Sequence, residues 1–192
     1  MARPQAFDTQ EALHCAMHVF WRKGYEATSL SDLLQATGLS KSSLYATFGS
    51  KHDLMLKAFD KYRTDRQLDM SRMLDVTPAR PGIEAFFRMI VEDVRSPEQG
   101  SGCMSINQAV ELAPHDTEIR CRIESDFQAI EQALAHAIDR GQADGSVTAK
   151  CPPADLAKLM VVAFPGLQVL TRSGIERLRV DEGLALVLAL LD

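Results

Sequence analysis

The stretch Gly38–Lys51, GLSKSSLYATFGSK, decides the fold of this chain. Gly38 can supply the positive φ of a tight turn, and Ser40 can cap a short helix over residues 41–47. Ser50 is followed three residues later by Asp53, a pairing that is typical of a capping box at the start of a helix. The stretch therefore predicts a short helix that lies between a tight turn and the start of a longer helix.

Two further helices precede this stretch. Apolar residues recur at intervals of three and four over residues 8–23, which is typical of an amphipathic helix, and Gly24 ends it. Ser29 and Asp32 form another capping box, so a second short helix follows and ends at Gly38. Two short helices joined by a glycine turn and packed on a longer helix describe a helix-turn-helix.

The outward face of the helix over residues 41–47 carries small hydroxyls, a lysine and a tyrosine. Small hydroxyls can lie close to base edges or phosphates, and Lys and Tyr side chains reach further. The net charge of the whole chain is −5, but residues 1–63 hold eight Lys/Arg and six Asp/Glu, whereas the remainder holds 13 and 20. This asymmetry is expected when only the N-terminal part meets a polyanion.

Helical periodicity continues to the C-terminus, without a strand pattern or an internal repeat. We expect an all-α protein of about nine helices: a three-helix helix-turn-helix domain at 1–50, a linking helix at 51–74 and a helical bundle at 75–192. A connector is predicted at 76–81 and a loop at 97–102. The other helices are predicted at 83–94, 103–112, 116–140 with Gly141 beyond the end, 153–173 with a break at Pro165-Gly166, and 181–191.

Composition indicates an ordinary globular protein, since 46% of the 192 residues are hydrophobic and 24% are charged. The N-terminus, MARPQAFDTQ, has no apolar signal segment. The most apolar runs, 156–170 and 184–191, are too short or too interrupted to span a bilayer. The four cysteines have no CxxC spacing and are expected to be thiols. We therefore expect a cytoplasmic protein without a membrane partner.

The segment from Leu13 to Leu56 resembles the DNA-binding domain of TetR-family transcriptional regulators. Leu34 departs from the family pattern, which usually has a small residue there. The family's C-terminal domain is divergent and carries an effector pocket and a dimer interface. The matching residues fall in register without a gap and are Phe20, the run Gly24–Ser29, Leu33, Ala36, the run Gly38–Lys41, Leu44, Tyr45, Phe48, Ser50, Lys51, Asp53 and Leu54.

The resemblance implies a repressor that binds a double-stranded, pseudo-palindromic DNA operator and leaves it when a small-molecule effector binds or a thiol is modified. It also implies a homodimer formed through the helices near 154–173 and 181–191. Three helix N-termini, at Ser29, Ser40 and Ser50, would present free N–H groups to phosphate. The predicted DNA-binding residues are Thr28, Ser29, Ser40, Lys41, Ser42, Ser43, Tyr45, Thr47 and Lys51.

Cys103 lies at the predicted start of a helix, where the N-terminal dipole lowers a thiol pKa. The run Gly102–Met104, with Ala109–Ala113, resembles a branch of the family in which a cysteine at this point senses electrophiles or oxidants. The alternative is a buried cysteine that packs like alanine. The candidate effector-binding or sensing residues are Cys103, Met104, Asn107, Gln108, Glu111, Phe127 and Phe164.

Other functions find less support in the sequence. His14 and His18 are one helical turn apart and lack a third ligand, so no metal site is expected. Motifs of hydrolases and metalloproteases are absent from the sequence, and we predict no catalytic residue and no cofactor. The main alternative to the DNA-binding regulator is a helical dimer that acts as an interaction scaffold without binding DNA.

Overall fold

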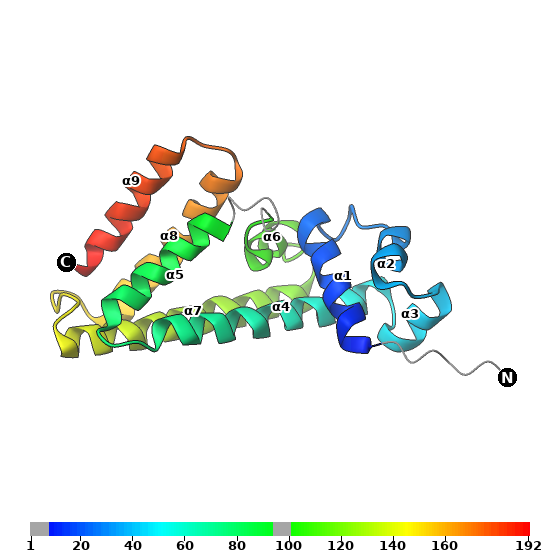
Figure 1. Ribbon diagram of the computed structural model, residues 1–192, viewed down its shortest axis with the longest axis horizontal. Helices are drawn as coiled ribbons and strands as arrows, with labels where there is room; N and C mark the ends of the chain where they lie inside the picture. The colour runs from blue at the N-terminus through cyan, green and yellow to red at the C-terminus, as the bar shows by residue number, and fades with distance from the viewer. Residues whose placement is uncertain (1–7, 94–100) are drawn as a thin grey trace.

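The computed structural model describes residues 8–93 and 101–192, and this part of the chain forms nine α-helices, a final 3-10 turn and no strand (Figure 1). The predicted all-α fold is confirmed. Residues 97–100 of the predicted loop lie outside the described residues. The elements are α1 Thr9–Lys23, α2 Leu30–Thr37, α3 Lys41–Phe48, α4 Lys51–Leu74, α5 Ala79–Asp93, α6 Met104–Glu111, α7 Thr117–Asp144, α8 Pro153–Arg172, α9 Arg177–Leu188 and η1 Ala189–Leu191.

Helices α1, α2 and α3 pack together with the N-terminal half of α4, and we call this part the head. Its core is built from side chains with 2% exposure or less, including Phe20 of α1, Leu33 of α2, and Leu44 and Phe48 of α3. Gly38 links α2 to α3 in the left-handed conformation, with φ 66°. The predicted helix-turn-helix is therefore present.

Helix α4 starts in the head and continues into the larger part of the molecule, where it runs beside α7 (Figure 1). Its head end buries Leu54 and Phe59, and its far end buries Met70 and Leu74. One helix of 24 residues thus contributes to the cores of both parts. Helices α5, α8 and α9 lie at the end of α7 that is remote from the head (Figure 1).

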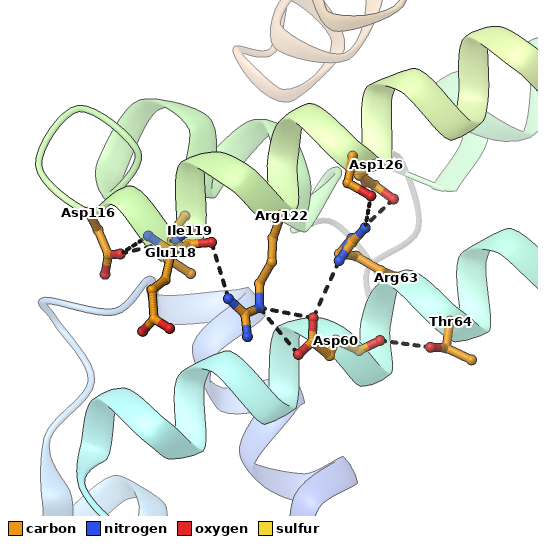
Figure 2. A network of polar contacts seen from close by, with 9 residues as sticks. Asp60, Arg63, Thr64, Asp116, Glu118, Ile119, Arg122 and Asp126 are labelled. Atoms are coloured by element: carbon orange, nitrogen blue, oxygen red, sulfur yellow. Dashed lines mark hydrogen bonds and ion pairs between the residues drawn. The ribbon is translucent and has the colours of Figure 1, made fainter.

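A polar network joins α4 to α7 (Figure 2). Arg122 of α7 donates to Asp60 of α4, with Nε 3.0 Å from Oδ1. Arg63 of α4 donates to the same Asp60 oxygen at 3.3 Å and lies 3.5 Å from the Asp126 carboxylate. Ser105 of α6 donates to Asp126 at 2.5 Å, so α6 belongs to the same network. The carboxylate of Asp126 is buried, accepts a hydrogen bond from the neutral Ser105 hydroxyl and forms an ion pair with Arg63.

One boundary was predicted wrongly in each of α5, α7 and α9. Helix α9 begins at Arg177, four residues before the expected start at 181. Helix α5 begins at Ala79, four residues earlier than expected, because Pro81 lies in its first turn, where its missing N–H costs no hydrogen bond. Helix α7 continues past Gly141 to Asp144, because Gly141 is on a buried face against which Val147 packs. The chain turns only at Gly145, which is in the left-handed conformation.

Helix α8 is continuous through Pro165, where a break had been predicted. By length and composition it is apolar enough to cross a membrane, in contrast to the sequence-based expectation. One such helix is weak evidence for a membrane span, because core helices pass the same test. Its buried side chains, among them Met160, Phe164 and Leu167, face the core, and α8 packs on α5, α7 and α9.

Candidate functional site

Helix α3 presents a polar outer face at the surface of the head. Leu44 and Phe48 hold its inner face, so Lys41, Ser42 and Tyr45 are exposed, Tyr45 by 38%. Ser43 and Thr47 are half-buried beside them. The predicted hydroxyl-rich face is therefore on the surface, carried by a helix with a fixed inner side.

Ser40 organises the start of α3. Its Oγ accepts the N–H of Ser43 at 3.2 Å and lies 3.0 Å from the Ser42 hydroxyl and 2.9 Å from the Ser43 hydroxyl. The first turn of α3 contains no acidic residue. A negative group near this turn would meet three hydroxyls and a positive helix end.

The other two helix N-termini already hold a carboxylate. Asp32 accepts from the backbone and hydroxyl of Ser29, and Asp53 accepts from the backbone and hydroxyl of Ser50. A hydrogen bond from Lys23, with those from Ser29, lowers the pKa of Asp32 to about 2. Both carboxylates are therefore charged at neutral pH, and of the three N-termini the one at Ser40 has no acidic residue in its first turn. The phosphate contacts at the three N-termini stay predictions.

Two predicted phosphate contacts have their polar atoms engaged inside the head. Thr28 is 1% exposed, and its hydroxyl donates to the Gly24 carbonyl at 2.5 Å, whereas the neighbouring predicted residue Ser29 is exposed. Lys51 donates to the Tyr25 carbonyl at 2.6 Å, and its Nζ lies 4.3 Å from the centre of the Tyr25 ring. Lys51 is half-buried and holds the turn between α1 and α2.

A cavity of about 60 Å³ lies among α1, α4, α5, α6, α7 and α8. Of the predicted effector residues, it brings together Cys103 and Phe164. Its walls are mainly apolar and aromatic, with a few polar groups, which is the usual character of a small-molecule site. The lining residues are Trp21, Tyr62, Arg66, Gln67, Met70, Phe86, Met89, Ile90, Gly102, Cys103, Ser105, Asp126, Ile130, Phe164 and Gln168.

Cys103 is the N-cap residue of α6 and is buried in the cavity wall. Burial raises the pKa of its thiol, although a hydrogen bond with Tyr62 acts in the opposite direction. The expected lowering of the thiol pKa by the helix N-terminus is therefore wrong for this conformation, because the loss of hydration outweighs the helix dipole.

The remaining predicted effector residues lie elsewhere. Met104 and Gln108 are fully buried, and Phe127 packs edge-on against Phe164 without lining the cavity. Asn107 and Glu111 line a neighbouring, wider groove of about 570 Å³ between α1, α6 and α8. Asn107 contacts Arg172 and donates to the Ser101 carbonyl, and both Glu111 oxygens accept backbone N–H groups of the head.

Sequence reasoning missed several polar groups at the cavity, notably Tyr62, Asp126 and Gln168. A signal was available for two of them. Asp126 is next to Phe127 in a run of apolar residues that recur at helical spacing, and Gln168 interrupts the most apolar run of the chain. A polar residue on an inward helix face needs a buried partner or a ligand, and this pattern is a marker of a site.

An apolar stripe crosses the outer surface of α8 and α9. Val162 and Leu186 are its most exposed members, at 75% and 74%. Exposed apolar areas on adjacent helices are typical of interaction surfaces. The other members are Leu159, Val169, Leu170 and Leu178.

Potential metal ligands do not cluster in the part of the chain that the structure describes. Within residues 8–93 and 101–192, no group of three or more His, Cys, Asp or Glu side chains is placed to hold an ion. His14 and His18 lie with their Nε2 atoms 3.1 Å apart, and His18 also packs against Trp21. The pair is a local contact along α1.

Comparison with protein families matches both parts of the chain. Residues 12–58 match the family described as bacterial regulatory proteins, tetR family. Residues 79–176 match the tetracyclin repressor-like C-terminal domain.

Individual relatives agree with the family matches. YezE of Bacillus subtilis, an uncharacterized HTH-type transcriptional regulator, is 36% identical over 77% of this chain and 79% of its own. The HTH-type transcriptional repressor ComR of Escherichia coli is 30% identical over 90% of this chain and 83% of its own. Among solved structures, a cysteine mutant of the TetR-family regulator CifR, complexed with 26-bp operator DNA, has 31% identity and a TM-score of 0.85, and the match covers 97% of this chain and 98% of that one.

Proposed function

Since the chain belongs to the TetR family of bacterial transcriptional regulators, we propose that it is a homodimeric repressor that binds a pseudo-palindromic operator through α3. A change at the cavity, caused by a small-molecule effector or by modification of Cys103, releases the DNA. In this proposal the head, at residues 1–50, binds DNA. The linking helix α4, at 51–74, couples the two parts, and the bundle, at 75–192, recognises the effector. Its place of action is the cytoplasm.

The outer face of α3 is the observation that carries this proposal. Lys41, Ser42 and Tyr45 are exposed on a helix whose inner side is fixed by two fully packed side chains. Such a helix fits the major groove, where its first residues reach base edges and its cations reach phosphates. The acidic bundle lies far along α4, and at physiological salt a Debye length of about 8 Å screens much of its repulsion of DNA.

The two subunits of the dimer pair through the apolar stripe on α8 and α9. A two-fold dimer binds an operator whose two half-sites are related by the same symmetry. A two-fold dimer presents two α3 helices, which read half-sites about 34 Å apart or a multiple of that spacing. The name of the relative ComR, a transcriptional repressor, supports repression as the direction of control.

A selected DNA duplex and a charge-removal series test the proposal. Duplexes are selected from a random pool with the wild-type protein, and binding is measured over a range of salt concentrations. The double variant Lys41→Ala/Tyr45→Ala is expected to lose at least about tenfold in affinity, because each base or phosphate contact contributes roughly 1–3 kcal/mol. The slope of log affinity against log salt should also fall by about 1 for each phosphate contact that the substitutions remove.

Arg88→Ala is the matched control, since it removes one exposed positive charge from α5, outside the head. We expect it to bind the selected duplex as the wild type does. Equal affinity of the double variant and the wild type would exclude α3 as the reading helix. Failure of the wild type to select any duplex would favour the scaffold alternative.

A further inference from the structure

Helix α6 is held at both ends by other elements, although it is only eight residues long. At its start, the N–H of Cys103 donates to Gln168 of α8 at 2.7 Å, and the N–H of Met104 donates to the Tyr62 hydroxyl of α4 at 3.1 Å. Cys103, Gln168 and Tyr62 all line the cavity. The N-terminal end of α6 is therefore fixed to the cavity wall.

At the other end of α6, the Glu111 side chain reaches the turn between α1 and α2. Its Oε2 accepts the N–H of Tyr25 at 3.1 Å, and its Oε1 accepts the N–H of Glu26 at 2.9 Å. Two consecutive backbone donors thus hold one carboxylate. Hydrogen bonds to a charged group are roughly twice as strong as those between neutral groups, so this contact is stronger than an ordinary surface contact.

The backbone of the turn is shaped around this carboxylate. Gly24 has φ +81°, and a Cβ built there would lie 2.8 Å from Glu111 Oε2. A residue with a side chain would therefore be strained and would displace the carboxylate. Gln108, one turn earlier on α6, donates to the same Oε2 at 3.3 Å and fixes the carboxylate from its own helix.

The turn between α1 and α2 also positions groups that lie near the DNA in the proposed function. The Tyr25 carbonyl accepts from Lys51, at the start of α4. The Gly24 carbonyl accepts from Thr28, which precedes the exposed N-cap of α2, Ser29. A displacement of Glu111 therefore moves the backbone that sets the entry to α2 and the start of α4.

We propose that Glu111 is a positioning residue that transmits the state of the cavity directly to the head. This inference rests on the proposed function, since it names a path by which an event at the cavity changes DNA binding. A shift of the Cys103 end of α6 displaces the helix as a rigid unit, and the carboxylate pulls the α1–α2 turn. This path through α6 and Glu111 is separate from the connection between head and bundle through α4. It gives Glu111 a role different from the predicted contact with effector, because both of its oxygens are already occupied.

Amide hydrogen exchange of the full-length protein tests this path without a known effector. Coupling between two sites is reciprocal, so a duplex bound at the head must change the stability of α6. With saturating selected duplex, exchange of the peptide over residues 104–112 should slow by about fivefold or more in the wild type, the lower end of typical coupling. In Glu111→Ala the slowing should fall below about twofold, while protection of residues 24–48 by DNA persists.

Two further variants complete the test. Glu111→Gln keeps one acceptor oxygen, so exchange over residues 104–112 should slow by an intermediate factor when DNA binds. This variant also replaces Glu111→Ala in the test if the alanine variant does not fold. Glu124→Ala removes an exposed glutamate of α7 and should behave as the wild type. Equal slowing over 104–112 in the wild type and in the Glu111 variants would overturn the proposal. So would a wild-type protein that binds the duplex without any change in that peptide. If the wild type binds no duplex, the proposed function itself fails.

Discussion

At the scale of single residues, Cys103 shows how burial can reverse a local electrostatic preference. The residue is at a helix N-terminus, which favours the thiolate, but it is enclosed by the cavity wall. Loss of hydration raises the thiol pKa above its ordinary value of 9.0, and the nearby Asp126 carboxylate acts in the same direction. The thiol is therefore protonated at neutral pH in this conformation.

Alkylation kinetics should follow from this pKa. The thiolate is the reactive form, so reaction of Cys103 with iodoacetamide should be slow at pH 7 and should still accelerate as the pH rises above 9. The exposed Cys121 and Cys151 are internal references and should react first. Peptide mass spectrometry after timed reaction gives each rate.

The same reagent tests thiol control of DNA binding. Once Cys103 is modified, the affinity for the selected duplex should fall, and Cys103→Ser should retain its affinity under identical treatment. Reaction of Cys103 as fast as that of Cys121 at neutral pH would contradict the buried thiol. Equal loss of affinity in Cys103→Ser would exclude Cys103 as the sensor.

Residue roles could be predicted from the sequence where a local pattern controls them. The caps Ser29, Ser40 and Ser50 were predicted correctly because capping depends on spacing within one turn. The position of Glu111 could not be predicted, because it depends on a contact outside its own helix that spans 86 residues along the chain.

At the scale of helices, the contact between α4 and α7 depends on a buried charge network. Removal of Arg63 would leave Asp126 buried with only the neutral Ser105 donor. We expect Arg63→Ala to lower the free energy of unfolding by about 3 kcal/mol, the usual cost of breaking a buried ion pair from one side. Urea denaturation with a constant m value measures the change.

Two controls separate the network from a general effect of losing a charge. The double variant Arg63→Ala/Asp126→Ala should be less destabilised than the sum of the single variants, because removal of both partners leaves no unpaired charge. Arg120→Ala, at an exposed site where the guanidinium donates to Thr117, should change stability by less than about 0.5 kcal/mol. Strict additivity in the double variant would contradict the proposed dependence on charge pairing.

The number and order of the helices could be predicted because their apolar periodicity is local. The C-terminal end of α7 and the continuity of α8 could not be predicted. Gly141 is typical of a helix end in sequence, but in the fold it gives Val147 room to pack. Pro165 lacks the N–H for one helical hydrogen bond, yet the side chains on both sides of it, Phe164 and Leu167, are buried and hold α8 together.

At the scale of the whole molecule, the apolar stripe on α8 and α9 determines the proposed state of association. Val162→Asp or Leu186→Asp puts a charge in the centre of that stripe, where pairing would bury it at high cost. Analytical ultracentrifugation should show the chain mass of 21.2 kDa for these variants and twice that mass for the wild type. Affinity for a duplex with two half-sites should fall, because the monomer contacts only one of them.

Leu68→Asp provides the comparison, because Leu68 is 53% exposed on α4 and lies outside the stripe. It should remain dimeric and bind the duplex. A dimer that survives both stripe substitutions would place the interface on another surface. The stripe was predictable from the apolar composition of the last two helices.

Trp21 gives the molecule an optical property of its own. It is the only tryptophan in the chain, and its indole N–H donates to the Gly102 carbonyl at 2.6 Å. The ring belongs to a helix of the head, lines the cavity and lies 5.2 Å from the Arg66 guanidinium. Tryptophan fluorescence of the unlabelled protein thus originates from one place, the wall shared by the head and the cavity. An occupant that moves Arg66 or breaks the indole hydrogen bond changes that emission, so a library of compounds can be screened without attaching a dye.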